Sequence, residues 1–323
     1  MREKKTFQIK PANAMIWNLN ELLDFLLANQ GQHIVIENGT EGCCANAIGL
    51  YAWLDKFEFA SVTIETSNIL EKHSRYTIKF KLPWKFLQVF RAVDSSLHTW
   101  NTKAIFGTLY ARPIWHRLGL TAYLLNHHAD KSVVGCLTDP QNINERDLSE
   151  IKELYYYHPE SMQNYANIMN QLPLRHHGIA PYFRHHAELG PVDGPIQVAE
   201  HVYQNFLIDI VSESFTTGDS FFITEKTVRS MMLKKPMIVM GSRNYLDYLH
   251  QMGFQTFNDF WDENYDGFCD ADRYKKILEL IDQLAGVSVD KLQKIYQGMQ
   301  SVLDHNYNLL MSRQFQTKIT YIE

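Results

Sequence analysis

The chain has 323 residues, of which 45% are hydrophobic, and a formal net charge of -5 at neutral pH. This length is enough for two domains of ordinary size, and the apolar share is that of a globular protein. The acidic balance excludes a global basic field of the kind that binds nucleic acid without sequence preference.

The N-terminus and the cysteines indicate in which cellular compartment we expect the protein. The first ten residues, MREKKTFQIK, are charged and lack the apolar core of a signal peptide. No run of about 18 apolar residues occurs, which argues against a membrane span. The four cysteines, Cys43, Cys44, Cys136 and Cys269, are too few and too scattered for a disulfide framework. We therefore expect a cytoplasmic protein with reduced thiols.

The first third of the chain alternates helical and strand patterns. Leucines recur at helical spacing, short β-branched runs read as buried strands, and YTIKFKL alternates as an edge strand does. The predicted helices lie at 16–29, 43–56 and 83–93, and the predicted strands at 33–37, 60–66 and 76–82. Such alternation predicts parallel β-α-β units.

A second cycle of alternation begins near residue 103. Its predicted strands are 104–109, 132–136, 206–211, 237–240 and 255–257, and its predicted helices are 116–126, 224–235, 245–252, 273–284 and 289–310. Residues 139–194 are polar, so we expect short helices and binding loops there. The fold class is therefore α/β, with two Rossmann-like domains whose parallel sheets face a cleft, and with C-terminal helices.

The most informative stretch is residues 221–242, FFITEKTVRSMMLKKPMIVMGS. Thr224 can cap a helix through its hydroxyl. Glu225 and Lys226 then fall in the first turn, where unpaired backbone N–H groups and the helix dipole favour anions. The helix ends at Pro236, and a buried strand follows. A cation beside N–H groups suits a diphosphate, and a nearby carboxylate suits a ribose diol, so the stretch predicts half of a nucleotide-sugar site.

Two arginines follow the first strand of the second cycle. Arg112 lies in the predicted loop and Arg117 in the first turn of the next helix. The guanidinium fork binds phosphate oxygens bidentately, so both side chains could join Lys226 around one diphosphate. The alternative for Arg117 is a solvated helix residue. Glu213 follows the next strand and suits a sugar or ribose hydroxyl, with a plain turn carboxylate as its alternative.

Four segments of this region follow one another in a family-specific order. They are Val-Ser-Glu-Ser at 211–214, Phe-Ile-Thr-Glu-Lys at 222–226, Lys-Pro-Met-Ile-Val at 235–239 and Gly-Ser at 241–242. This order resembles the donor-binding region of α1,3-fucosyltransferase-type enzymes, which are GT-B glycosyltransferases. The resemblance implies that Glu225 and Lys226 hold the ribose and the phosphates. It also implies that Glu213 matches an earlier signature Glu and Arg117 a phosphate-contacting Arg.

The sequence departs from the fucosyltransferase pattern at two positions, and it also resembles a second group of proteins. Ser214 stands where the family usually has Asn, and Phe222 where it usually has Tyr. The chain also resembles uncharacterised viral and bacterial glycosyltransferase-like proteins, through Arg-Pro-x-x-His-Arg at 112–117 and Gly-Phe-x-Thr-Phe at 253–257. We expect residues 1–102 to form the acceptor-binding domain and residues 103–272 the donor-binding domain. For the helices at 273–323, crossing back to the N-terminal domain is one option.

The implied reaction is an inverting, metal-independent transfer from a UDP- or GDP-linked sugar, with no further cofactor. Cationic side chains and helix N-termini stabilise the leaving diphosphate, and a carboxylate takes the acceptor's proton. Our candidate for this base is Glu41, in a turn after the strand at 33–37, with Asp94 as a weaker rival. Asn68 and His73 follow the next strand and are candidate acceptor contacts.

Histidine pairs at 127–128, 176–177 and 185–186 invite a metal interpretation. Adjacent histidines point in divergent directions and no carboxylate-rich DxD triplet follows a strand, so we expect no metal site. The pair of aromatic residues Tyr182 and Phe183 has two interpretations, stacking on a nucleobase or ordinary loop packing.

Two other functions stay open. The first is a phage-type transferase that glycosylates hydroxymethylated DNA, which needs a basic strip beside the acceptor side. Its candidate members are Lys72, Arg75, Lys79, Lys81, Lys85 and Arg91. Such binding would depend on salt. The second is a non-catalytic nucleotide- or glycan-binding module, which would bind a donor without turnover.

Overall fold

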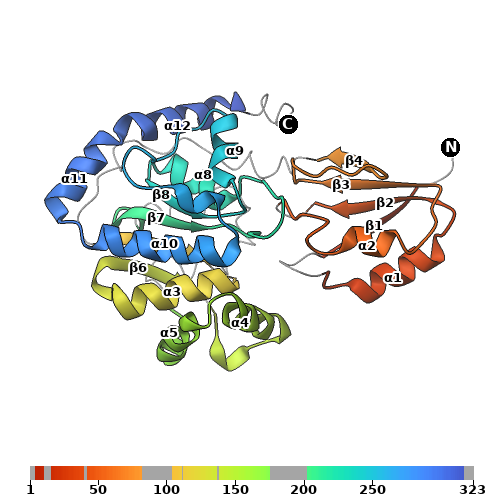
Figure 1. The fold of residues 1–323 in the computed structure, drawn as a ribbon, viewed down its shortest axis with the longest axis horizontal. Coiled ribbons are helices and arrows are strands. Elements are labelled where there is room, and N and C mark those ends of the chain that lie inside the picture. Colours follow the sequence, from red (N-terminus) through yellow and green to blue (C-terminus); the bar gives the residue numbers. More distant parts are fainter. Residues whose placement is uncertain are drawn as a thin grey trace, which may run out of the picture.

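The computed structural model describes residues 4–10, 16–39, 42–81, 104–110, 112–136, 138–174 and 202–315. These residues form an α/β fold with two four-stranded sheets, and every strand pair in both sheets is parallel. Figure 1 shows the two sheets apart from each other along the long axis of the molecule. The predicted α/β class with parallel sheets is therefore confirmed.

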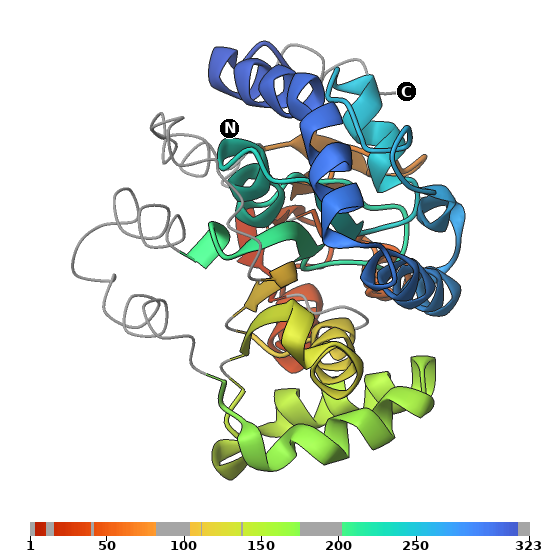
Figure 2. The ribbon, with the colours of Figure 1, turned by 90° about the vertical axis from the view of Figure 1, so that its left-hand side faces the viewer.

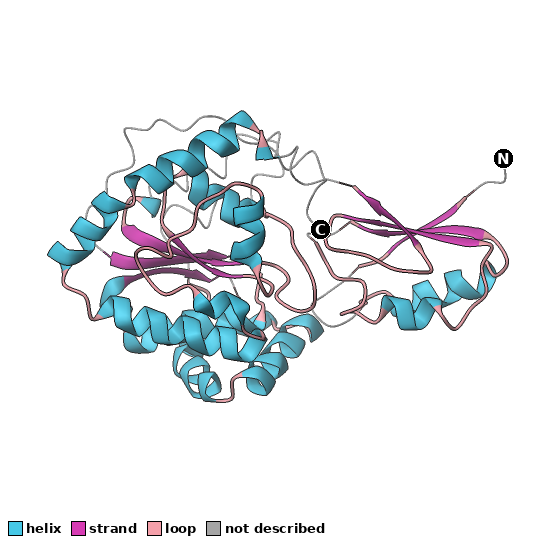
Figure 3. Ribbon diagram, turned by 45° about the horizontal axis from the view of Figure 1, so that its top comes forward, coloured by secondary structure: helices cyan, strands magenta, loops and turns pink. Residues whose placement is uncertain are grey.

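The first sheet has the strand order β1-β2-β3-β4. Its strands are β1 Lys5–Gln8, β2 His33–Asn38, β3 Ser61–Thr66 and β4 Thr77–Phe80. The last of them lies at the edge, as its alternating pattern predicted, whereas β1 was not predicted because its four residues are largely exposed. The helices α1 Leu19–Ala28 and α2 Leu50–Leu54 lie on one face of this sheet (Figure 3).

The helix predicted at 43–56 is much shorter in the structure. Only α2, Leu50–Leu54, is helical, and turns occupy residues 45–49. Gly49 precedes the helix in the left-handed region, with φ 72°. A residue in that conformation interrupts a right-handed helix, so the apolar side chains of 43–48 are buried by turns instead. The helix predicted at 83–93 lies outside the described residues.

The second sheet has the strand order β6-β5-β7-β8. Its strands are β5 Ala104–Tyr110, β6 Ser132–Cys136, β7 Phe206–Ser212 and β8 Met237–Met240. All residues of β5, β7 and β8 are buried, which confirms the interpretation of their apolar runs as central strands. The chain moves from β5 to β6 on one side and continues with β7 and β8 on the other. The strand order therefore reverses between β5 and β7, which is where open α/β sheets bind ligands.

Helices cover both faces of the second sheet (Figure 1). On one face lie α3 Trp115–His127 and α10 Asp270–Ala285, and on the other α8 Glu225–Met232, α9 Tyr245–Gln251 and α12 Gln300–Ser312. The polar region predicted to hold short helices contains α4 Glu145–Tyr157 and α5 Glu160–Ile168, which pack against α3 (Figure 2).

The C-terminal helices differ from the prediction in one respect. The helix predicted at 289–310 is two helices, α11 Val289–Gly298 and α12, which meet at Met299. The described part of the C-terminal segment packs on the second sheet, since α10 contacts β8 and α12 contacts α8. Crossing back to the first sheet therefore stays a prediction, and residues 316–323 lie outside the described part.

The strand predicted at 255–257 is wrong. The backbone of Gln255 pairs with a side chain instead of a strand, because Asn306 Oδ1 accepts from its N–H and Asn306 Nδ2 donates to its carbonyl, each at 2.8 Å. The asparagine from α12 thus satisfies the groups that a neighbouring strand would otherwise pair.

The segment between β7 and α8 joins the two sheets. Phe215 belongs to the hydrophobic core of the first sheet, although it follows a strand of the second. Asn68, which follows β3, donates from Nδ2 to the carbonyl of Asp219 at 2.8 Å and accepts at Oδ1 from the N–H of Phe221 at 3.0 Å. Ser220 donates to the carbonyl of Gly42, which follows β2. The loops that follow β2 and β3 are therefore in contact with the segment that follows β7.

Candidate functional site

The corner between β5 and α3 carries two arginines in different environments. Arg112 is exposed in the bend after β5. Arg117, in the first turn of α3, is 2% exposed and is therefore no solvated helix residue. Its Nε and Nη2 donate to the carbonyl of Ser212 at 3.3 and 2.8 Å, and its Nη1 donates to the carbonyl of Arg112 at 3.3 Å. Arg117 thus ties the end of β7 to the loop after β5.

The corner between β7 and α8 forms as its sequence predicts. Thr224 caps α8, because its hydroxyl accepts from the N–H of Lys226 at 3.2 Å. The Lys226 side chain is 12% exposed, and its Nζ donates to Glu225 Oε1 at 2.7 Å and to Ser214 Oγ at 3.3 Å. The ammonium is therefore held in place beside the end of β7.

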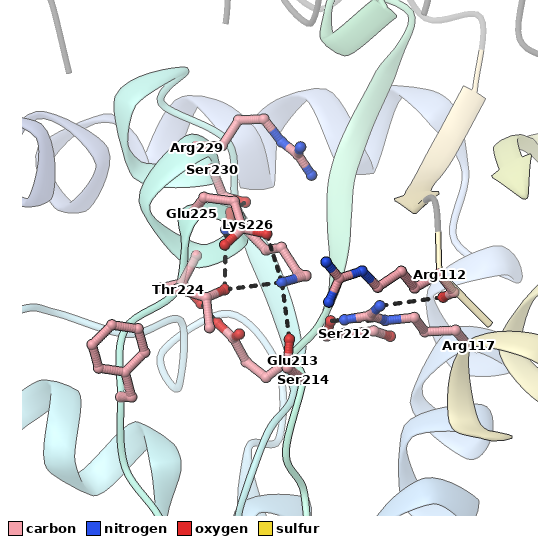
Figure 4. A network of polar contacts seen from close by, with 12 residues as sticks. Arg112, Arg117, Ser212, Glu213, Ser214, Thr224, Glu225, Lys226, Arg229 and Ser230 are labelled. Atoms are coloured by element: carbon pink, nitrogen blue, oxygen red, sulfur yellow. Dashed lines mark hydrogen bonds and ion pairs between the residues drawn. The ribbon is translucent and has the colours of Figure 1, made fainter. Parts of the chain in front are cut away.

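The structure brings the two corners together at the carboxyl end of β7. Arg117 binds the carbonyl of Ser212, and Lys226 binds the hydroxyl of Ser214, two residues further along the chain. Figure 4 shows the Arg112 side chain extending toward Lys226 from the opposite corner. Three cationic groups from two β-α corners thus gather at the point where the strand order reverses.

The two carboxylates predicted to bind hydroxyls have different surroundings. Glu213 is buried, and its Oε1 accepts from Thr227 Oγ1 at 2.6 Å and from the Tyr245 hydroxyl at 3.0 Å. Burial raises the pKa of Glu213, and the attraction of Lys226 offsets only part of that rise. This carboxyl group therefore fixes α8 and α9 to the end of β7.

Glu225 is the accessible carboxylate of the pair. Its side chain is 45% exposed. Partial burial on its own would raise the pKa of Glu225, but the neighbouring Lys226 ammonium lowers it below the usual value. Glu225 is therefore ionised at neutral pH and can accept hydrogen bonds from the hydroxyls of a ligand.

A buried arginine that the sequence did not single out supports the site from α10. Arg273 donates from Nη2 to the carbonyl of Thr216 at 2.9 Å and to Asp270 Oδ1 at 2.6 Å, and from Nη1 to the carbonyl of Phe268 at 2.8 Å. It holds the segment after β7 against α10. The available signal was its place on the apolar stripe of that helix, in register with Ile277, Leu280, Ile281 and Leu284.

The candidate acceptor contacts lie on the first sheet. Asn68 is 1% exposed, and its amide is occupied by the bonds across the junction. His73 is half-buried, and its ring stacks against those of Tyr51 and Tyr76, with ring centroids 4.2 and 4.5 Å away. The acceptor roles of Asn68 and His73 stay predictions. Glu41, Asp94, Tyr182 and Phe183 lie outside the described residues, as do the histidine pairs at 176–177 and 185–186.

The basic strip that DNA binding would need is partly neutralised. Arg75 pairs with Asp55 at 3.0 Å, and Lys81 lies 3.0 Å from Glu65 and 3.6 Å from Glu37. The proposed strip members Lys85 and Arg91 lie outside the described part of the chain. Two of the four described strip cations are therefore matched by carboxylates of the same sheet or its neighbouring loop.

No protein-family model matches the chain, and no curated protein matches it. Within the described ranges, histidine, cysteine and carboxylate side chains do not gather in groups of three or more that could hold a metal ion. Of the helices that the structure describes, none has both the length and the apolar character needed to cross a membrane.

Proposed function

We propose that the protein is a GT-B-type glycosyltransferase that moves a hexose or pentose from a nucleotide-diphosphate sugar to an acceptor, with inversion and without a metal ion. One observation carries the proposal. Arg112, Arg117 and Lys226 gather at the carboxyl end of β7, at the switch point of a parallel sheet. Cations beside the N-terminus of a helix form a site suited to a diphosphate.

Each side chain of the site is given a role that follows from its environment. Arg112 and Lys226 contact the diphosphate together with backbone N–H groups in the first turn of α8. Arg117 donates to two backbone carbonyls, so it positions the end of β7. Its positive charge attracts the diphosphate without a direct contact. Glu225, whose side chain is 45% exposed, accepts from the ribose hydroxyls, as the fucosyltransferase resemblance implies.

The contacts between the sheets support a GT-B arrangement with acceptor binding at 1–102 and donor binding at 103–272. Residues that follow β2 and β3 bond to residues that follow β7, so an acceptor on the first sheet would face a donor on the second. The acceptor oxygen attacks the anomeric carbon, and the bond from that carbon to the diphosphate breaks. Its electron pair leaves with the diphosphate, and the proton passes to a carboxylate, for which Glu41 is our candidate.

Calorimetry with a panel of UDP-, GDP-, dTDP- and CMP-sugars tests the proposal. We expect one donor to bind, and Arg112→Ala and Lys226→Ala each to weaken it by about 1.5–3 kcal/mol, the scale of a hydrogen bond to a charged group. Lys276→Ala is the matched control, because Lys276 is an exposed lysine on α10 paired only with Glu279. Binding of no donor, or full affinity in both variants, would refute the proposal. Turnover with the bound donor separates an enzyme from a non-catalytic binding module.

A further inference from the structure

The β5-α3 corner also contains a buried histidine, His116, whose ring nitrogens make no hydrogen bond within the described part of the chain. His116 is the second residue of α3 and is 0% exposed. Neither Nδ1 nor Nε2 of its ring has a hydrogen-bond partner among the described residues. Leaving a buried polar group unpaired costs free energy, and native proteins keep few such groups. A buried ring with two unpaired nitrogens therefore calls for a ligand or another function.

The ring lies within a cluster of cations. Burial lowers the pKa of His116 well below its usual value, and Arg117, Arg273 and Lys226 lower it further. These three cations come from three different helices, α3, α10 and α8. The imidazole is therefore neutral at neutral pH, with one N–H donor and one acceptor nitrogen.

Further unpaired groups belong to residues that bind, or are, two of these cations. Arg273 Nε and the Thr216 hydroxyl oxygen are both buried without a hydrogen-bond partner in the described part of the chain. They belong to one contact, because Arg273 Nη2 donates to the carbonyl of Thr216. The Ser212 hydroxyl, on the residue whose carbonyl binds Arg117, is also buried and unpaired. Donors and hydroxyls around several cations match a ligand with many anionic oxygens and at least one hydroxyl group.

We propose that His116 binds the sugar-diphosphate part of the donor. Its ring N–H donates to a phosphate oxygen, and its other ring nitrogen accepts from a hydroxyl of the transferred sugar. This inference rests on the proposed function and adds a contact that the donor motif does not include. Residues 215–216 shift to admit the ligand, while Arg117 and Lys226 keep Ser212 and Ser214 in place.

Three substitutions test the contact, with inorganic pyrophosphate, UDP and GDP as probes in calorimetry. His116→Phe keeps a ring of similar shape but loses both nitrogens. His116→Gln and His116→Asn each keep one donor and one acceptor, near the positions of Nε2 and Nδ1. His127→Phe is the matched control, because His127 is an exposed residue at the other end of the same helix.

We expect His116→Phe to bind the best of these probes at least about tenfold more weakly, and the Gln or the Asn variant to stay within about threefold of the wild type. His127→Phe should bind like the wild type. Unchanged affinity in His116→Phe, together with a loss in Lys226→Ala, would overturn this inference and leave the proposed function standing. Failure of the wild-type protein to bind any of the probes or any nucleotide sugar would overturn both.

A second measurement covers the case in which His116→Phe does not fold. In wild-type protein with ¹⁵N-labelled histidine, we expect the ring nitrogen resonances of His116 to shift on addition of the best-binding probe, while those of His127 stay in place. The assignment comes from the signal that disappears in the Gln or Asn variant. Ring resonances of His116 that do not move at saturating ligand would overturn the inference.

Discussion

Substitution of Asn68 is the strongest test of how the two sheets are joined. Its amide donates to the carbonyl of Asp219 and accepts from the N–H groups of Phe221 and Leu70. Asn68→Ala removes these three bonds, together with the one that Nδ2 donates to Glu71 Oε2 at 3.3 Å, and leaves the buried N–H of Phe221 without its partner. Leaving a buried group unpaired costs about 1–3 kcal/mol, and each further bond contributes about 1 kcal/mol. With the bonds to Asp219 and Leu70 counted as well, we therefore expect a loss of about 3–5 kcal/mol in the free energy of unfolding.

Urea denaturation followed by tryptophan fluorescence and by circular dichroism measures this loss. Asn68→Asp is an informative second variant, because it keeps the acceptor oxygen but loses the donor to Asp219. It also places a second carboxylate where Asn68 Nδ2 now lies 3.3 Å from Glu71 Oε2. We expect this variant to be no more stable at pH 7 than Asn68→Ala, since like charges at that distance repel.

Asn167→Ala is the matched control for both variants. Asn167 is exposed on α5, and its amide binds the side chain of Asn126 at 2.9 Å. A surface substitution of this kind should change the free energy of unfolding by less than about 0.5 kcal/mol. If Asn68→Ala also stayed within that range, the bonds across the junction would not hold the sheets together, and the contact between these loops would need another cause.

Three other predictions concern stability and binding. Burial raises the pKa of Glu263 to about 7, so the folded chain keeps a proton there that the unfolded chain loses near pH 4.5. Stability should therefore fall as the pH rises through this window, and Glu263→Gln should remove about 3 kcal/mol of that fall in urea titrations at pH 4.5 and 8. Gly42 has φ 78° and an added Cβ would meet Phe222, so Gly42→Ala should lower the free energy of unfolding by at least about 1–2 kcal/mol in the same assay. Because Arg75 and Lys81 are ion-paired, we expect no gel shift of duplex DNA between about 50 and 200 mM salt; retention that weakens with salt would instead favour the DNA-modifying alternative.

The parts of the fold that the sequence predicted are those that depend on local patterns. The apolar runs of β5, β7 and β8 are buried on both faces, so their identity follows from composition alone. The cap at Thr224 depends on residues two positions apart and formed as predicted. The position of Lys226 in the first turn of α8 is a consequence of that local geometry.

The parts that the sequence did not predict depend on contacts between distant segments. Arg273 meets Thr216 across 57 residues, and Asn68 meets Phe221 across 153. The sequence pattern within a single helix or strand does not indicate which distant residues form a hydrogen bond with each other. The short helix α2 is a different case, because Gly49 takes a left-handed conformation that the apolar periodicity of 43–56 does not reveal.

The burial of Arg117 changes how a diphosphate site at this edge would work. A guanidinium in solvent would have to be ordered by the ligand, at a cost in side-chain entropy. Arg117 is instead ordered in advance by the carbonyls of Ser212 and Arg112, and Lys226 by Ser214 and Glu225. Only the exposed Arg112 side chain remains to be ordered by an anion. In the proposed transfer, Arg117 and Lys226 would therefore act by preorganisation, which is the form of electrostatic stabilisation that a departing diphosphate needs.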